Sequence, residues 1–226
     1  MLPVLHHEWN LTPEAARELQ ARLAQSVIRE DRLPVNPQFV AGVDVAYATD
    51  SDKVYAGVAV LDVASLELVE TRTAVEVGGF PYLPGLFSFR EIPPILKALA
   101  LLESPPDLIV CDAQGLAHPM RFGMASHLGL VLDVPTIGCA KKRLIGDYPA
   151  NPRHRGERAD LMDAGEVVGS VLCTQNETRP VFASIGHRVS LETACAWILK
   201  LAPTYRLPET TRKANELVNL LRQVAK

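Results

Sequence analysis

The stretch LIVCDAQGLAHP, residues 108–119, contains the pattern on which the predicted fold depends. Its first four residues, Leu108 to Cys111, are all apolar, which is typical of a short strand buried on both faces in a parallel arrangement. A second short buried run, Thr136 to Ala140, follows helical material around Met124 to Leu132. Because parallel strands need a crossover connection, usually a helix, these segments predict a strand, helix, strand unit.

The residues before this unit predict three antiparallel strands. From Phe39 to Tyr47 larger apolar residues alternate with small ones, so Asp44 lies inside a strand on a face of small residues. Two more strand-like runs follow, Val54 to Leu61 and Leu66 to Val77. A meander that leads into parallel strands with helices between them is an α/β plan with a mixed sheet. This order resembles the ribonuclease H-like architecture, in which three antiparallel strands precede the parallel ones and helices flank the sheet.

Four segments have the periodicity of amphipathic helices. Thr12 can cap the first, and Ser190 can cap the third. The second covers residues 89–102, although Pro93 and Pro94 must kink it or delay its start. The fourth lies at the C-terminal end of the chain, where apolar residues recur on one stripe.

The C-terminal half also predicts a polar loop and a hairpin. Residues 147–160 include several arginines and indicate an exposed basic loop. Two strand-like runs follow, Glu166 to Cys173 and Val181 to Ile185. No internal repeat or linker divides the chain, so we expect residues 1–226 to form a single domain.

Composition limits the class of protein. With 226 residues and 48% hydrophobic content the chain can bury a full core, which excludes disordered and collagen-like classes. A formal net charge of only −3 argues weakly against a nucleic-acid binder, because a cluster of carboxylates would offset basic residues elsewhere. Four cysteines without a C-x-x-C pair favour reduced thiols. The N-terminus lacks the basic and apolar regions of a signal peptide, so we expect a cytoplasmic monomer without a membrane span.

Three acidic residues occupy positions that suit a metal site. Asp44 lies within the first strand, Glu91 early in the second helix, and Asp112 at the end of the first parallel strand, where open α/β sheets bind ligands. Unpaired carboxylates on a buried surface cost several kcal/mol each, and a divalent cation removes that penalty. Mg²⁺ prefers oxygen ligands and suits one or two carboxylates plus a substrate phosphate. Such a site can stabilise in-line displacement at phosphorus.

Each of these residues also has a simpler interpretation. A strand-end aspartate such as Asp112 more often caps a turn or helix, and a helical glutamate such as Glu91 is usually solvated. Gly115 allows a φ angle that other residues resist, and Pro119 fixes the chain after His118, so we expect the loop to hold His118 close to Asp112. There it could assist a water, donate to a phosphate or bond the carboxylate, and the residues alone leave these roles open.

Four motifs together resemble the endonuclease V family, the deoxyinosine 3′ endonucleases. They are VAGVDVAY at 40–47, PYLPGLFSFRE at 81–91, DAQGLAHPMRFGMASHLGL at 112–130 and VPTIGCAKKRL at 134–144. The resemblance implies a ribonuclease H-like fold, with Mg²⁺ or Mn²⁺ held by Asp44, Glu91 and Asp112 and with His118 beside the metal. It also implies that Lys141 lies near the reacting phosphate, although a lone lysine after a strand is usually solvated. The implied reaction hydrolyses the second phosphodiester bond 3′ to the lesion in DNA repair, leaving 5′-phosphate and 3′-hydroxyl ends.

The PYLPG segment gains a role from the same resemblance. Pro81 and Pro84 stiffen a loop that contains Leu83 and presents the ring of Tyr82. In the family interpretation this loop is a wedge that fills the gap left by a flipped base. A tyrosine packed within a rigid loop is the simpler alternative. Glycines permit close backbone approach to a base, so the candidate pocket residues are Gly85, Gly115 and Gly138.

Two positions depart from the family pattern. Ala113 stands where many members have glycine, and its methyl group narrows the base pocket or changes backbone freedom. Asn215 stands where other members often have histidine or aspartate. We expect neither residue to touch the metal ligands.

The leading hypothesis is a metal-dependent endonuclease whose partner is deoxyinosine-containing DNA. Basic residues at 141–143, 153–158 and 212–213 would then contact phosphates. The alternatives are an inosine-specific endoribonuclease acting on inosine-containing RNA, or a flap or junction nuclease. A non-catalytic nucleic-acid binding module is disfavoured, because it predicts a missing carboxylate and all three are present.

Overall fold

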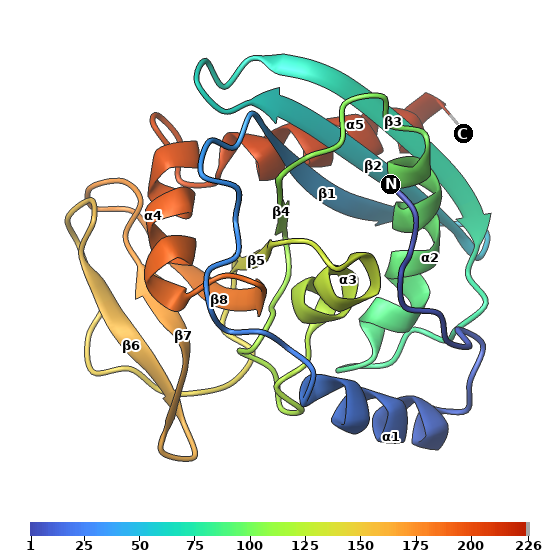
Figure 1. The fold of residues 1–226 in the computed structure, drawn as a ribbon, viewed down its shortest axis with the longest axis horizontal. Coiled ribbons are helices and arrows are strands. Elements are labelled where there is room, and N and C mark those ends of the chain that lie inside the picture. The colour runs from blue at the N-terminus through green and yellow to red at the C-terminus, as the bar shows by residue number, and fades with distance from the viewer. Residues whose placement is uncertain (225–226) are drawn as a thin grey trace.

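A computed structural model describes residues 1–224 and contains one eight-stranded mixed sheet. The strands are β1 (Phe39–Tyr47), β2 (Lys53–Asp62), β3 (Leu68–Val77), β4 (Leu108–Cys111), β5 (Thr136–Ala140), β6 (Arg158–Asp163), β7 (Glu166–Leu172) and β8 (Val181–His187). They lie in the order β3-β2-β1-β4-β5-β8-β7-β6 (Figure 1). The predicted meander and parallel unit are both confirmed, since β1 pairs antiparallel with β2 and parallel with β4, which pairs parallel with β5.

The sheet continues beyond the parallel strands as an antiparallel extension. Strand β8 pairs antiparallel with β5, and β7 and β6 follow at the edge. One expectation is wrong here, because residues 158–160 belong to β6 instead of an exposed basic loop. Ala159 and Leu161 alternate with the polar residues Arg158 and Asp160, so the run has strand periodicity that its charges obscure.

Helices cover both faces of the sheet. They are α1 (Pro13–Ala24), α2 (Phe87–Ala100), α3 (Met124–Leu132), α4 (Leu191–Leu201) and α5 (Glu209–Val224). On one face, Ala41 and Val43 of β1 pack in a cluster with Ile92 and Ile95 of α2, and this cluster also includes α3. On the other face, α4 packs in a second cluster and α5 crosses β1 and β2 (Figure 1).

Gly42 explains why α5 can lie so close to β1. It faces away from α2, and a Cβ at this position would lie 2.0 Å from the carbonyl oxygen of Thr210 in the first turn of α5. Only glycine allows the two backbones to approach in this way. The alternation of small and large residues in β1 therefore determines which helix packs on which face.

The N-terminal segment is attached to α2 and α3 before α1 begins (Figure 1). The N-terminal ammonium donates to the carbonyl of Leu99 at 3.0 Å, and the amide of Val4 donates to the carbonyl of Val131 at 2.9 Å. Thr12 caps α1 as predicted, its hydroxyl accepting from the amide of Ala15. The segment therefore packs against the helices that border the carboxylates.

Helix α2 begins before its two prolines. It starts at Phe87 and continues through Pro93 and Pro94, so the prolines do not delay its start. Among residues 1–224, no helix is long and apolar enough to cross a membrane. All four cysteines are free and buried.

Candidate active site

The fold brings the three predicted carboxylates to one end of the sheet. Val43 of β1 pairs with Cys111 of β4, so Asp44 of β1 lies next to Asp112, the residue that directly follows β4. Glu91 lies in the second turn of α2. The hydroxyl of Tyr47, the last residue of β1, donates to Glu91 Oε1 at 2.7 Å. The pairing of β1 with β4 therefore brings the two aspartates close enough for the charge of Asp112 to act on Asp44.

Burial and mutual repulsion disfavour the ionised form of the three carboxylates. Burial, together with the charges of Asp44 and Asp112, raises the pKa of Glu91 to about 7, although the hydrogen bond from Tyr47 opposes the shift. Burial also raises the pKa of Asp44, and the charge of Asp112 adds to this, while the bond from Asn215 opposes it. Positive charge at this point would therefore be strongly favoured.

Each carboxylate has a different partner in the structure. Lys141, directly after β5, forms an ion pair with Asp112. Asn215 of α5 donates from Nδ2 to Asp44 Oδ2 at 2.8 Å. The expectation that Asn215 does not touch a metal ligand is therefore wrong, because the close approach of α5 at Gly42 places this helix against β1.

The donor set fits a hard divalent cation. Three carboxylates supply the oxygen ligands that Mg²⁺ and Mn²⁺ prefer, and the raised pKa values of Asp44 and Glu91 indicate a shortage of positive charge. Within residues 1–224, no three acidic, histidine or cysteine side chains are already gathered around one point as a metal would require. Side-chain adjustment away from the present partners would therefore accompany binding of a cation.

A cavity of about 250 Å³ opens beside the carboxylates. Its walls include Glu91, Asp112, Gly85, Ser88, Ala113 and His118. Its size is close to the lower end of the about 300–1,000 Å³ typical of small-molecule sites. Ala113, one of the two departures from the family pattern, is therefore a residue of the cavity wall.

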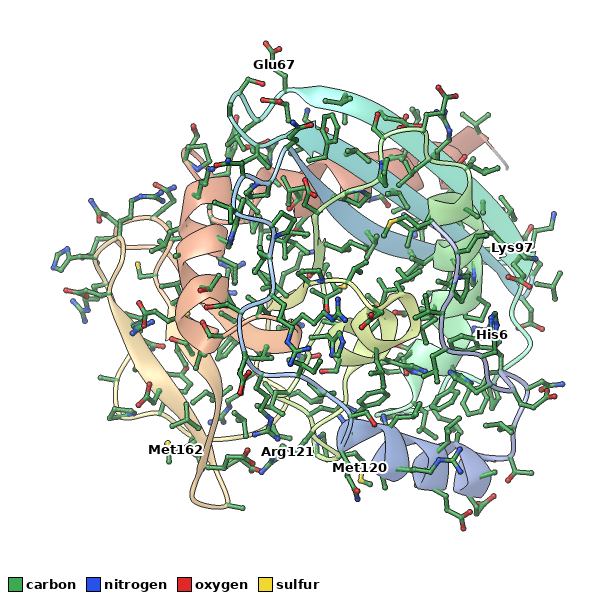
Figure 2. The ribbon with its side chains drawn as sticks, in the orientation of Figure 1. His6, Glu67, Lys97, Met120, Arg121 and Met162 are labelled. Atoms are coloured by element: carbon green, nitrogen blue, oxygen red, sulfur yellow. The ribbon has the colours of Figure 1, made fainter. Side chains whose placement is uncertain are left out.

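His118 lies in this wall as a neutral imidazole. Burial, together with the charge of Arg121, lowers its pKa to about 4, although the nearby backbone of Gly85 opposes the shift. Its Nδ1 accepts from the amide of Met120 at 3.2 Å, so the ring proton resides on Nε2. Figure 2 shows Arg121 near the β6–β7 hairpin, where its guanidinium pairs with Asp163 and Glu166. The amide of Met120 therefore fixes the orientation of the imidazole within its own loop.

The PYLPG loop presents an exposed aromatic ring next to this cavity. Tyr82 is 61% exposed, and its ring centroid lies 4.5 Å from that of Phe87, which lines the cavity, and 5.5 Å from that of Tyr47. Pro81 and Pro84 are exposed on either side. Leu83 anchors the loop by packing against the cluster under α1. Such a rigid loop with a free ring face can stack on a base.

Comparison with known proteins identifies relatives of this chain. The family profile described as Endonuclease V matches residues 21–216. Endonuclease V of Nostoc sp. is 46% identical over 213 residues, covering 94% of this chain and 96% of that protein. The crystal structure of endonuclease V from Streptomyces avermitilis superposes with a TM-score of 0.92 at 46% identity, covering 100% of this chain and 99% of that one.

The chain belongs to the endonuclease V family. It is an endonuclease, a hydrolase, with the family's ribonuclease H-like fold. A further structure of the family, endonuclease V from Ciona intestinalis, was determined with a 24-mer DNA containing an inosine followed by a ribo-adenosine. It superposes with a TM-score of 0.85 at 26% identity, covering 94% of this chain and 98% of that one.

Of the three glycines expected in the pocket of this endonuclease, only Gly85 lines the cavity. A Cβ at Gly115 would lie 2.0 Å from the carbonyl oxygen of Ile185, and one at Gly138 would lie 2.6 Å from the amide nitrogen of Gly115. Both positions are therefore needed for close packing between the loop after β4 and strands β5 and β8. These two glycines therefore pack the backbone next to the cavity and do not line it.

Sequence reasoning missed several residues of the site. Gln20 of α1 is buried, and its Nε2 donates to the carbonyls of Gly85 at 3.0 Å and Phe122 at 2.9 Å, which joins the two loops that flank the cavity. A polar residue next to Leu19 on the apolar face of an amphipathic helix was a signal that could have found it. Ser88 was also missed, although it lies within a family motif.

Most of the basic residues expected to contact phosphates have structural partners instead. The Arg155 guanidinium donates to three backbone carbonyls, including those of Ala202 at 2.6 Å and Leu199 at 2.8 Å. Arg158 pairs with Glu192, and Arg212 pairs with Glu209 and Glu216. In this member of the family, Lys141 is the predicted basic residue that lies against a carboxylate of the cluster.

Proposed function

We propose that this endonuclease recognises deoxyinosine in DNA by taking the hypoxanthine base into the cavity beside the carboxylates. The observation that carries the proposal is that the same cavity is lined by Glu91 and Asp112 and by the first turn of α2. The first N–H groups of a helix lack partners within it, so those of Phe87 and Ser88 can donate to the 6-oxo group. The Ciona intestinalis relative, whose DNA contains an inosine, supports this assignment.

Tyr82 is the wedge in this proposal. Its exposed ring stands on a loop stiffened by Pro81 and Pro84, next to the cavity that receives the base. A ring that replaces lost base stacking is worth about 1–3 kcal/mol. This offsets part of the cost of extruding the base from the duplex.

The chemistry depends on the acidic cluster. Asp44, Glu91 and Asp112 hold Mg²⁺, or Mn²⁺ in its place, which supplies positive charge to stabilise phosphodiester hydrolysis. Lys141 places an ammonium at the same point, where it can pair with a phosphate oxygen. His118, a neutral imidazole, lies with Gly85 of the PYLPG loop in the wall of the same cavity.

The cleavage site in this proposal is the second phosphodiester bond 3′ to the lesion, which leaves 5′-phosphate and 3′-hydroxyl ends. Membership of the endonuclease V family supports it. Inosine-containing RNA is a second candidate substrate, because the Ciona intestinalis complex has a ribo-adenosine directly after the inosine.

Matched oligonucleotides test the proposal. DNA and RNA strands of identical sequence, with and without one inosine, are incubated with the protein in Mg²⁺ or EDTA, and the cut is mapped at single-nucleotide resolution. We expect Mg²⁺-dependent cleavage of the inosine strands at the second bond. Cleavage of inosine-free flaps or junctions without any inosine preference would reject the proposed substrate.

Paired variants test the acidic cluster. Glu91→Gln should lower cleavage by more than about 100-fold, since loss of even an outer partner of a metal ligand typically costs 10–100-fold. Glu67→Gln is the matched control, because Glu67 is exposed on the β2–β3 turn, which Figure 2 shows at the far edge of the sheet. Equal activity of the two variants at saturating Mg²⁺ would reject the metal role of Glu91.

A further inference from the structure

A chain of hydrogen bonds joins the N-terminal segment to the cavity. The Nδ1 atom of His7 lies 2.8 Å from the carbonyl oxygen of Glu8, and its Nε2 lies 2.8 Å from Nε2 of His127. The Nδ1 atom of His127 lies 2.9 Å from Oγ of Ser88. Ser88 lines the cavity that the proposed function assigns to the base.

The hydrogen bond between His7 and Glu8 determines which atom donates in each of the bonds that follow. A carbonyl oxygen only accepts, so Nδ1 of His7 carries its proton and Nε2 of the same neutral ring accepts. His127 must then donate from Nε2 to His7, which leaves its Nδ1 as an acceptor. Ser88 must therefore donate its hydroxyl proton to His127.

The surroundings of His127 keep this arrangement fixed. The ring is fully buried, and the aromatic rings of Trp9, Phe89 and Phe122 lie 5.0 to 5.2 Å from it, centroid to centroid. Burial lowers the pKa of both histidines, so both rings are neutral. Because His127 is buried, no bulk water can replace His7 or Ser88 as its hydrogen-bond partner. If the Ser88 hydroxyl donated to another group, Nδ1 of His127 would lose its buried hydrogen bond.

We propose that Ser88 determines base specificity by accepting a hydrogen bond from a ring N–H of the base, with His127 and His7 as the positioning residues that make it an obligate acceptor. The inference rests on the proposed function. With its own proton committed to His127, the Ser88 oxygen offers the cavity lone pairs alone. Hypoxanthine has a proton on N1, whereas N1 of adenine is a lone pair and would face the Ser88 oxygen unfavourably.

This assignment makes the N-terminal segment part of the recognition site. His7 lies outside the four motifs of the family resemblance, and it reaches the cavity only through His127 of α3. Hydrogen-bonding sites reject analogues that lack the matching group because the site's own polar atoms are then left unpaired. A residue from the first ten of the chain thus contributes to discrimination at a cavity formed mainly by α2 and the loop after β4.

Binding measured without metal tests the inference. Fluorescence anisotropy in EDTA compares three single-stranded DNA oligonucleotides that differ at one position, which is hypoxanthine, adenine or unsubstituted purine, whose N1 is also a lone pair. We expect the unaltered protein to prefer hypoxanthine. Ser88→Ala should weaken hypoxanthine binding and leave purine binding equal or tighter, so that the hypoxanthine-over-purine ratio falls about 10-fold, in line with loss of one hydrogen bond.

Histidine variants separate positioning from a general structural effect. His7→Ala should lower the same ratio, because the His127 ring is then free to adopt its other tautomer and release Ser88. His6→Ala is the control, since this neighbouring histidine is exposed, as Figure 2 shows on the N-terminal segment. A Ser88→Ala protein that keeps the full ratio would overturn the inference while the proposed function stands. An unaltered protein without any hypoxanthine preference would overturn the proposed function itself.

Discussion

Substitution of Gly42 by alanine should disrupt the contact that places α5 on the sheet. The added Cβ would lie 2.0 Å from the carbonyl oxygen and 2.3 Å from the carbonyl carbon of Thr210. Both atoms belong to backbone, so no side-chain rotation relieves the overlap. An ordinary contact begins at 3.4 Å, so α5 or β1 must move by more than 1 Å.

The cost of this movement exceeds the gain from replacing glycine. Overpacking of a well-packed interior costs typically about 1–3 kcal/mol, and a backbone clash of this size belongs at the upper end. Alanine recovers only about 0.4–1 kcal/mol by restricting the unfolded chain. The net loss is therefore about 2–3 kcal/mol of unfolding free energy. At roughly 2–4 °C per kcal/mol for a chain of this length, Tm should fall by about 4–12 °C.

Thermal unfolding followed by circular dichroism measures this loss. Gly79→Ala is the matched control, because a Cβ at Gly79 meets no atom within 4 Å, and its Tm should change by less than about 2 °C. Cleavage by Gly42→Ala should fall as well, since displacement of α5 moves Asn215 away from Asp44. If Gly42→Ala melts within 2 °C of the unaltered protein, the proposed close packing of α5 is wrong.

Three further predictions concern hydrogen bonds within the site and its surroundings. Tyr47→Phe removes the donor that opposes the raised pKa of Glu91, so half-maximal cleavage at pH 7 should require about 10-fold more Mg²⁺, as a metal titration of the rate would detect. Asn215→Ala should weaken Mg²⁺ binding by about 10–100-fold in calorimetry through loss of the bond to Asp44, and unchanged affinity would contradict the role of α5. His127 has a folded-state pKa well below its ordinary value of 6.5, so the unfolded chain binds more protons and stability should fall as pH drops below about 6.5. Melting curves at pH 7.5 and 5.5 should show this loss, and His127→Gln should reduce it.

The amino-acid sequence alone determined most of the elements, β6 excepted, and the three acidic residues. Alternation in β1 and the uniformly apolar β4 predicted a mixed sheet, because side-chain periodicity follows directly from strand geometry and burial. The sequence also predicted that Thr12 caps α1 and Ser190 caps α4, because a cap depends only on neighbouring residues. The motifs around Asp44, Glu91 and Asp112 identified the family, which the comparisons confirm.

Tertiary structure decided which side chains of these elements contact one another. Asn215 and Asp44 are 171 residues apart in sequence, and their contact depends on how closely α5 packs at Gly42. The same holds for Arg155, whose charge suggested phosphate binding but whose guanidinium holds backbone carbonyls together. Local sequence patterns reflect the burial and backbone conformation of each residue. Contacts between side chains that are distant in sequence depend on how the segments pack together. The polar contacts around the cavity, from Gln20 to the His7–His127 pair, therefore emerged only from the folded chain.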